Sequence, residues 1–425
     1  MSAKLCPNCG ARNSYTFYNV SGVPVNSCLL FSDRTDAKNM ARGEIDLAYC
    51  PRCSFIFNAA WQPDATAYTE LYEETQVFSP TYTTFQHQLA ADLIDRYGVI
   101  RKEIVEIGCG KGAFLTLLCE MGDNSGIGYD PSFIPERNTA GTANVVFKRE
   151  YFSETTDQPA PDLVCCRMTL EHISETRRFV DAVRRIASRE RGTIVFFQIP
   201  DVRRILAEGA FWDVYYEHCS YFSPPSLKYL FRMAGFDVLR VTGGFDDQYL
   251  TIEARPAVGV EGSDVMEDEG SEDLAGSVAA YSQAAATHVA EWNAQISSAA
   301  RAGARIVLWG SGSKAVAFLS AVNAGEAIEY LVDINPHRWG KFVPGTGKQI
   351  INPEHLSRYQ PDLVIAMNPI YRREIAGDLL RYDCRDALLC ALGDTTIKPV
   401  PAGTLTPYSA GTLPGSPAAP SYTRG

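Results

Sequence analysis

Short apolar runs alternate with helix-length segments through the middle of the chain, from about residue 68 to residue 255. Continuous apolar runs of four to eight residues are typical of buried strands. They occur at Ile104–Ile107, Asp162–Cys166, Gly192–Ile199 and Phe236–Val241. The alternation indicates an α/β domain with a largely parallel sheet, so we predict a doubly wound core over residues 63–256.

A second α/β unit is expected nearer the C-terminus. Its strands are predicted at Ile306–Trp309, Ile328–Val332 and Asp362–Ala366, with a glycine turn and an apolar helix after the first strand. This pattern indicates a smaller, Rossmann-like unit, which with a preceding helix covers residues 275–396. In that helix, apolar residues recur at steps of three and four and share one face, which should dock on a neighbour. They are Val278, Tyr281, Ala285, Val289, Trp292, Ile296 and Ala299.

The remaining segments differ in composition. Residues 1–62 show little regular periodicity but carry two closely spaced cysteine pairs, which indicates a small metal-binding module. Residues 257–274 contain no Lys or Arg and many acidic residues, so we predict a solvated linker. Residues 397–425 are rich in Pro, Gly, Ser, Thr and Ala, and we expect a disordered tail there.

Composition and charge narrow the class of protein. The chain has 425 residues, too many for one ordinary domain, and its 46% hydrophobic and 21% charged residues are typical of folded globular proteins. A net charge of −11 opposes attraction to nucleic-acid phosphates and to anionic membranes, so neither is expected as a partner. No run approaches the ~20 apolar residues of a membrane span, and the first residues lack the apolar block of a secretory signal. We interpret the protein as cytoplasmic.

The two cysteine pairs have the spacing of a metal site. Cys6 and Cys9 form one C-x-x-C pair, and Cys50 and Cys53 form the other. Each pair can present two thiolates on one tight turn, and four thiolates complete the closed tetrahedron of a structural zinc ion. The long separation, residues 10–49, requires an inserted loop or small sheet. Two unrelated pairs of buried or redox-active cysteines are the alternative.

A glycine loop follows the first strand of the predicted core. Its glycines have G-x-G-x-G spacing, an acid precedes them by two residues, and a second acid follows the next strand, 22 residues beyond the first glycine. Glycines allow close approach of a ligand, and the acid that follows the next strand can accept hydrogen bonds from both hydroxyls of a ribose. A dinucleotide-binding loop usually reads G-x-G-x-x-G, which disfavours NAD.

This set of residues resembles the S-adenosylmethionine-dependent methyltransferases of the doubly wound class. The resemblance implies that the loop holds the methionine part of the donor and that the later acid holds its ribose. The donor-binding residues would be Glu106, Gly108, Cys109, Gly110, Gly112 and Asp130. Gly112 has a second interpretation, because a glycine there can serve only the packing of helix on strand.

The candidate for chemistry is an aromatic segment around a Glu-His pair, at residues 212–223. His218 can take a proton near neutral pH, and a tyrosine hydroxyl such as that of Tyr215 can donate to a developing oxyanion. Glu217 could orient the imidazole or hold a substrate hydroxyl. Taken alone, a histidine among aromatic residues is more often structural, and we interpret His172, after an earlier strand, as a residue that supports the fold.

The order of the whole chain resembles that of the deoxysugar C-methyltransferases, from about Cys6 to Asp394. The motif Y-x-E-H-x-x-Y-F-S at residues 215–223 and the motif D-x-N-P at residues 333–336 carry the resemblance, together with the cysteine pairs. It implies methylation at C3 of a nucleotide-linked keto-sugar through an enolate. His218 would be the general base, Tyr215 and Glu217 its supporting residues, and the four cysteines the zinc ligands.

The acceptor side departs from the family in two places. Ala315 and Val316 follow Lys314 where a glycine and a polar residue are usual, and residues 70–79 differ from the usual acceptor-side sequence. The glycine turn before Lys314 is either a phosphate-binding turn or a plain strand-to-helix turn, with similar weight. We assign it to the nucleotide part of the acceptor. The predicted substrate-binding residues are Tyr72, Tyr221, Gly310, Lys314 and Asp333.

The sequence therefore predicts a transferase with S-adenosylmethionine as donor, structural zinc and a small-molecule acceptor. The alternative is transfer to oxygen or nitrogen of a glycan or natural product, with the same donor site. A zinc-bearing scaffold without activity is opposed by the intact donor loop, and a nucleic-acid methyltransferase by the acidic charge. A dehydrogenase would need a hydride-transfer partner that the sequence does not offer. The sugar and the oligomeric state are not defined by the sequence.

Overall fold

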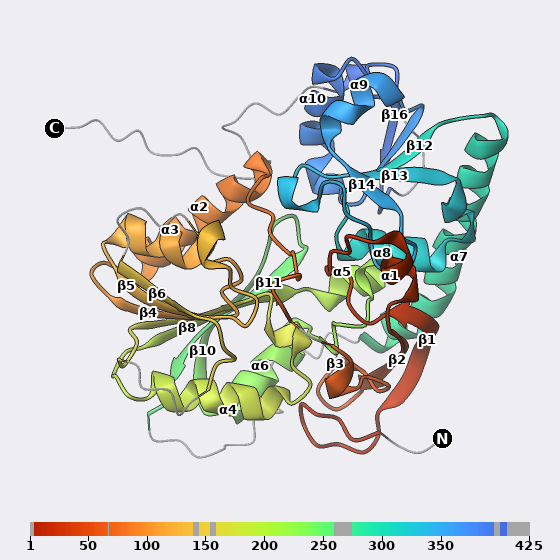
Figure 1. Ribbon diagram of the computed structural model, residues 1–425. Helices are drawn as coiled ribbons and strands as arrows, with labels where there is room; N and C mark the ends of the chain where they lie inside the picture. The colour runs from red at the N-terminus through yellow and green to blue at the C-terminus, as the bar shows by residue number, and fades with distance from the viewer. Residues whose placement is uncertain are drawn as a thin grey trace.

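The computed structural model describes residues 4–66, 68–138, 144–153, 159–258, 274–394 and 400–405. The largest of its three sheets has seven strands and lies on the left in Figure 1. The strand order is β10-β11-β8-β7-β4-β5-β6, and neighbouring strands are parallel except that β11 is antiparallel to both β10 and β8. The order reverses between β4 and β7, which is where doubly wound sheets bind ligands. The strands are β4 (Glu103–Ile107), β5 (Ser125–Tyr129), β6 (Asn144–Lys148), β7 (Leu163–Arg167), β8 (Ile194–Pro200), β10 (Phe236–Gly244) and β11 (Tyr249–Pro256).

Helices cover both faces of this sheet, as the predicted doubly wound fold requires. In Figure 1, α2 and α3 lie over one face and α4 and α6 over the other. A short helix, α5, follows β8. The helices are α2 (Pro80–Tyr97), α3 (Ala113–Gly122), α4 (Thr176–Ala187), α5 (Val202–Ala207) and α6 (Pro224–Met233).

The N-terminal module contains the small sheet that the cysteine spacing requires. Strands β1 (Tyr15–Pro24), β2 (Arg42–Cys50) and β3 (Phe55–Asn58) are antiparallel, and helix α1 (Arg34–Asn39) lies between β1 and β2. The fourth strand, β9 (Ser220–Tyr221), comes from the segment that carries the predicted catalytic residues. The module is therefore joined directly to the candidate site by strand pairing.

The C-terminal unit is a second parallel sheet, in the order β14-β13-β12-β15-β16-β17, with only β17 antiparallel. Its predicted strands occur where the apolar runs lie. The strands are β12 (Ile306–Trp309), β13 (Ile328–Val332), β14 (Gln349–Ile351), β15 (Leu363–Ala366), β16 (Leu388–Ala391) and β17 (Val400–Pro401). The helices of this part are α7 (Leu274–Arg301), α8 (Ser313–Ala321), α9 (Leu356–Tyr359) and α10 (Arg372–Arg381).

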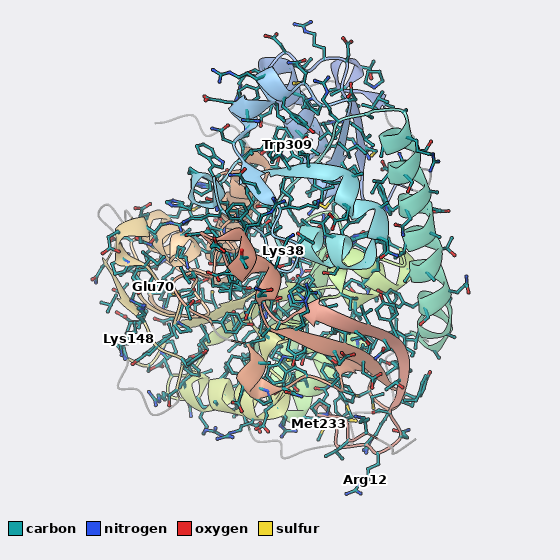
Figure 2. The ribbon with its side chains drawn as sticks, turned by 45° about the vertical axis from the view of Figure 1, so that its right-hand side comes forward. Arg12, Lys38, Glu70, Lys148, Met233 and Trp309 are labelled. Carbon is teal, nitrogen blue, oxygen red and sulfur yellow. The ribbon has the colours of Figure 1, made fainter. Side chains whose placement is uncertain are left out.

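The long helix α7 buries the predicted face. Five of its seven predicted residues are buried, and Val289 and Ala299 are partly buried against the same cluster. One continuous apolar cluster contains residues of β1, α5, α7 and the C-terminal sheet. Helix α1, which carries Lys38, also contacts the C-terminal unit, since Arg34 donates to the carbonyl of Gly347 at 3.0 Å (Figure 2). The three units thus share one apolar cluster, beside clusters that belong to the seven-stranded sheet or to the C-terminal sheet alone.

Most of the predicted linker and most of the predicted tail lie outside the described residues. The expected disorder of the tail does not hold for residues 400–405, because β17 pairs with β16 and Ala402 is buried. Among the helices that the structure describes, none combines the length and the apolar character needed to cross a membrane.

Candidate functional site

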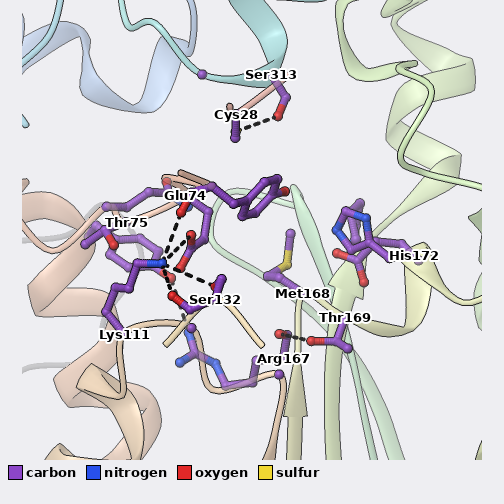
Figure 3. Close-up of a pocket in the computed structure, with 18 of the residues that line it drawn as sticks. Cys28, Glu74, Thr75, Lys111, Ser132, Arg167, Met168, Thr169, His172 and Ser313 are labelled. Carbon is purple, nitrogen blue, oxygen red and sulfur yellow. Dashed lines mark hydrogen bonds and ion pairs between the residues drawn. The ribbon is translucent and has the colours of Figure 1, made fainter. Parts of the chain in front are cut away.

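A cavity of about 670 Å³ lies where the three units meet. Its walls include the carboxyl ends of β4, β5 and β7, the segment after residue 72, and the start of α8 (Figure 3). Of the predicted donor-binding residues, Glu106, Gly108, Cys109, Gly110 and Asp130 line it. Of the predicted catalytic and substrate-binding residues, Tyr72, Tyr215, His218, Gly310, Lys314 and Asp333 line it.

The donor loop leaves no space for side chains at its first glycine. Gly108 has φ of 70°, and a Cβ there would lie 1.9 Å from Oγ1 of Thr169. The amide of Gly110 donates to Oδ2 of Asp130 at 2.9 Å, so the loop is tied to the end of β5. Backbone of the loop can therefore approach a ligand in the cavity closely.

Glu106 provides an unsatisfied acceptor beside this loop. It is buried, and its Oε2 has no hydrogen-bond partner on the residues that the structure describes. Burial raises the pKa of Glu106 to about 7, although the nearby Arg167 opposes the shift. An orphaned carboxylate oxygen on the wall of a cavity fits a cationic ligand group such as the ammonium of the donor.

Gly112 has the packing role that was the second interpretation. It is not among the cavity-lining residues, and it caps the N-terminus of α3 with φ of 83°. A Cβ there would lie 2.5 Å from the ring of Phe147. Only glycine fits this contact between helix and sheet.

Lys111 joins the donor loop to the acceptor-side segment. Its buried ammonium donates to the carbonyls of Tyr72 and Ser132, at 3.0 and 2.7 Å, and lies 3.8 Å from the carboxylate of Glu74 (Figure 3). Burial raises the pKa of Glu74 to about 7. The segment after residue 72 is thus held across the donor side of the cavity.

His218 and Tyr215 lie together on the cavity wall. Their ring centroids are 4.1 Å apart, and the ring of His172 lies 4.8 Å from that of His218. Burial, with His172 and Lys314 nearby, holds the pKa of His218 well below its usual value, so its imidazole is neutral near pH 7. His172 also lines the cavity, and its Nδ1 lies 2.7 Å from the hydroxyl of Tyr68 and 3.1 Å from the carbonyl oxygen of Glu217, contacts that fit a residue that supports the fold.

Glu217 does not take the position that we expected. Its carboxylate accepts from the amide and the hydroxyl of Ser27, both at 2.7 Å, and it does not line the cavity. Ser27 belongs to the N-terminal module, and its hydroxyl also lies 2.7 Å from that of Ser313 at the start of α8. Glu217 therefore joins all three units. Tyr221, in β9, is buried and also does not line the cavity.

The C-terminal glycine turn repeats the arrangement of the donor loop. The amide and hydroxyl of Ser311 donate to Oδ2 of Asp333, at 2.9 and 2.5 Å, as the amide of Gly110 does to Asp130. The ammonium of Lys314 donates to Asp213 at 2.5 Å.

Asp213 also accepts from Arg204, so one carboxylate bridges two cations on the cavity wall. Burial alone would raise the pKa of Asp213, but Lys314 and Arg204 hold it below its usual value. Sequence reasoning missed Asp213 and Arg204, because the contact that ties Asp213 to Lys314 joins residues 101 positions apart in the chain.

The four predicted metal ligands form one cluster. The sulfurs of Cys6 and Cys53 are 3.7 Å apart, those of Cys9 and Cys50 are 3.5 Å apart, and all four lie within 4.8 Å of one another. Four sulfurs at ~2.3 Å from a central ion would be separated by about 3.8 Å. The cluster fits a tetrahedral ion, and Cys28 is not part of it.

Two family models match this chain. Residues 82–241 match the family model of a methyltransferase domain, and residues 255–387 match that of a C-methyltransferase C-terminal domain. The protein is a S-adenosylmethionine-dependent methyltransferase. The chain is 26% identical to C-methyltransferase NovU of Streptomyces niveus over 398 residues, which cover 87% of this chain and 90% of NovU. The two matched domains follow one another along this chain, the methyltransferase domain first and the C-methyltransferase C-terminal domain second.

Solved structures match about two fifths of the chain. Magnesium protoporphyrin IX methyltransferase (ChlM) of Synechocystis PCC 6803 is 14% identical, with 42% of this chain and 84% of that chain covered and a TM-score of 0.34. The 1,6-didemethyltoxoflavin-N1-methyltransferase of Burkholderia thailandensis is 15% identical, with 42% and 81% covered and a TM-score of 0.33.

Proposed function

We propose that this methyltransferase acts on a carbon atom of a nucleotide-linked keto-deoxysugar. The observation that carries the proposal is a single cavity lined by the donor loop, by His218 and Tyr215, and by the C-terminal glycine turn. A cavity of about 670 Å³ has room for more than the donor alone. The relation to a C-methyltransferase over most of the chain supports carbon as the acceptor atom.

The donor-side residues fit S-adenosylmethionine. When bound, this donor supplies a methyl group on a positively charged sulfur. Gly108 and Gly110 allow close approach of backbone to the donor, and Asp130 at the end of β5 would accept its ribose hydroxyls. The orphaned Oε2 of Glu106 would accept from its ammonium group.

His218 and Tyr215 have the properties that enolate formation needs. A neutral imidazole has a free lone pair, so His218 can remove the proton from the carbon next to the ketone. The electron pair of that C–H bond then moves toward the ketone oxygen. The hydroxyl of Tyr215, which burial keeps protonated by raising its pKa, can donate a hydrogen bond to this oxygen.

We assign the nucleotide part of the acceptor to the C-terminal side of the cavity. Lys314 and Arg204 are two cations that share Asp213, and the N-terminus of α8 begins beside them. A phosphate group would compete with Asp213 for these cations. The amide of Ser311 is already bonded to Asp333, so Lys314 and Arg204, rather than the turn itself, carry this assignment.

We also propose that the four cysteines bind structural zinc. The sulfur separations match those of a tetrahedral Cys₄ site, which has no open position for chemistry. The ion would fix both cysteine turns and, through β3 and β9, the segment that leads from His218.

The test is incubation with donor carrying a ¹³C-labelled methyl group and a panel of nucleotide-linked keto-deoxysugars, followed by mass spectrometry and carbon NMR. The expected product has a new carbon–methyl bond. His218→Asn should lower the rate by at least about 10²-fold while donor affinity is retained. A label on oxygen or nitrogen would instead support the alternative of an O- or N-methyltransferase with the same donor site.

A further inference from the structure

We propose that Glu171 is the positioning residue that supplies negative charge beside His218 when the imidazole takes a proton. This inference rests on the proposed function, since it concerns the base of that reaction. The sequence favoured Glu217 for this role. The geometry assigns it instead to a glutamate four residues beyond the end of β7.

The carboxyl group of Glu171 is buried but unsatisfied. Glu171 lies in a short 3-10 helix, Leu170–His172, and only 1% of its surface is exposed. Neither of its oxygens has a hydrogen-bond partner on another described residue. Glu171 lines the cavity, and its carboxylate lies within 4.8 Å of ring nitrogens of both His172 and His218. Figure 3 shows His172 among the residues that line the cavity.

A buried carboxyl group with free oxygens indicates a partner that forms during turnover. Nδ1 of His218 is likewise buried without a partner among the described residues. In contrast, both oxygens of Glu217 are bonded to Ser27, outside the cavity wall. Of the two glutamates, only Glu171 is therefore available to a charged imidazole.

The charge balance of the wall explains why such a group is needed. Burial, His172 and Lys314 all disfavour the protonated form of His218. Removal of a carbon-bound proton places that proton, and one positive charge, on the imidazole, while the C–H electron pair moves to the ketone oxygen. A carboxylate within 4.8 Å offsets the new charge, in a site where solvent does not screen it.

This role gives the reaction a pH dependence. Burial raises the pKa of Glu171 to about 8, so its charged fraction grows as the pH rises through 8. The ionisable groups around Glu171 are His172, His218, Tyr68, Cys166 and Cys219, from the strands and loops packed against it. Burial lowers the pKa of His172 to about 4 and raises that of Cys219 to about 12, so neither changes charge between pH 6 and 9.

The experiment compares Glu171→Gln with Glu175→Gln, the same substitution at an exposed position on the following loop. In the wild type, kcat for carbon methylation should rise with pH to a plateau above about 8. Glu171→Gln should lower kcat by about 10- to 100-fold, remove this rise and leave donor affinity unchanged. Glu171→Asp should restore part of the rate, and Glu175→Gln should behave as the wild type. Unchanged kcat and pH profile in Glu171→Gln would overturn the proposal.

A second measurement needs no acceptor. NMR of ¹⁵N-histidine-labelled protein should show a shift of the His218 signal centred near pH 8 in the wild type and in Glu175→Gln. The shift should be absent in Glu171→Gln. If the shift is absent in the wild type, or persists in Glu171→Gln, Glu171 does not act on His218. If the NMR result is as expected but no acceptor is methylated on carbon, the proposed function fails and the pairing of Glu171 with His218 stands.

Discussion

The hydroxyl of Ser27 should determine the charge of Glu217, and Ser27→Ala tests this contact directly. The substitution removes the donor to Oε2 of Glu217 at 2.7 Å and leaves the amide donor to Oε1 in place. A hydrogen bond to a charged group contributes ~1.5–3 kcal/mol, which corresponds to about 1–2 pH units in the pKa of the acceptor. Burial already raises the pKa of Glu217 to about 7. In Ser27→Ala the pKa should therefore lie near 8–9.

The effect on stability should depend on pH. The carboxyl group of Glu217 releases its proton at a lower pH in the unfolded chain than in the folded protein. The free energy of unfolding therefore falls as the pH rises from the unfolded pKa to the folded pKa. At pH 8.5 the wild-type carboxylate is charged and uses the hydroxyl, so the variant should lose ~1.5–3 kcal/mol in the free energy of unfolding. At pH 5.5 the carboxyl is neutral in both proteins, and the loss should be about 1 kcal/mol or less.

Urea unfolding at the two pH values measures this difference. Ser32→Ala is a matched control, because Ser32 is an exposed serine of the same module whose hydroxyl accepts from Lys341. It should change stability by less than about 0.5 kcal/mol at either pH. An equal loss at pH 5.5 and 8.5 in Ser27→Ala would refute the reasoning, because it would mean that the hydroxyl acts on packing and not on the charge of Glu217.

Three further predictions concern the donor, the acceptor and the metal. Binding of S-adenosylmethionine should weaken by up to about 10-fold per pH unit below 7, because Glu106 must lose its proton to accept from the ammonium of the donor. Calorimetry at pH 6 and 7.5 measures this difference, and equal affinities would contradict the role of Glu106. Lys314→Met should raise KM for the acceptor by about 10-fold or more with donor affinity unchanged, whereas a normal KM would place the nucleotide elsewhere. Cys9→Ser should reduce the zinc content measured by atomic emission and lower the unfolding temperature, and full retention of zinc would exclude the Cys₄ site.

Local sequence patterns predicted the parts of the fold that depend on local chemistry. Ile306–Trp309 is a strand with the predicted bounds, because a continuous apolar run before a glycine suits a buried parallel strand. The strand Tyr249–Pro256 was missed, since its antiparallel pairing with β8 depends on residues 50 positions earlier. The cysteine cluster could be predicted because its spacing encodes its geometry.

The contacts around Glu217 could not be predicted in the same way. The partner of Glu217 is Ser27, 190 positions away, and neither residue belongs to a spacing motif that indicates the contact. His172 lines the cavity, and its place in the chain carried a usable signal for this position. It follows a strand whose carboxyl end meets the same sheet edge as Gly108 and Asp130, where ligands bind in doubly wound folds.

The contact between Ser27, Glu217 and Ser313 has a consequence for how the protein is made. Ser313 emerges from a ribosome 286 residues after Ser27. At ~5–20 residues per second, synthesis of that interval takes about 15–60 s. During this time the N-terminal module and the seven-stranded sheet can form, while the contact of Ser27 with Ser313 at the start of α8 is still missing. The catalytic cavity is therefore among the last features to be completed during translation, and the nascent chain exposes its apolar lining until α8 arrives.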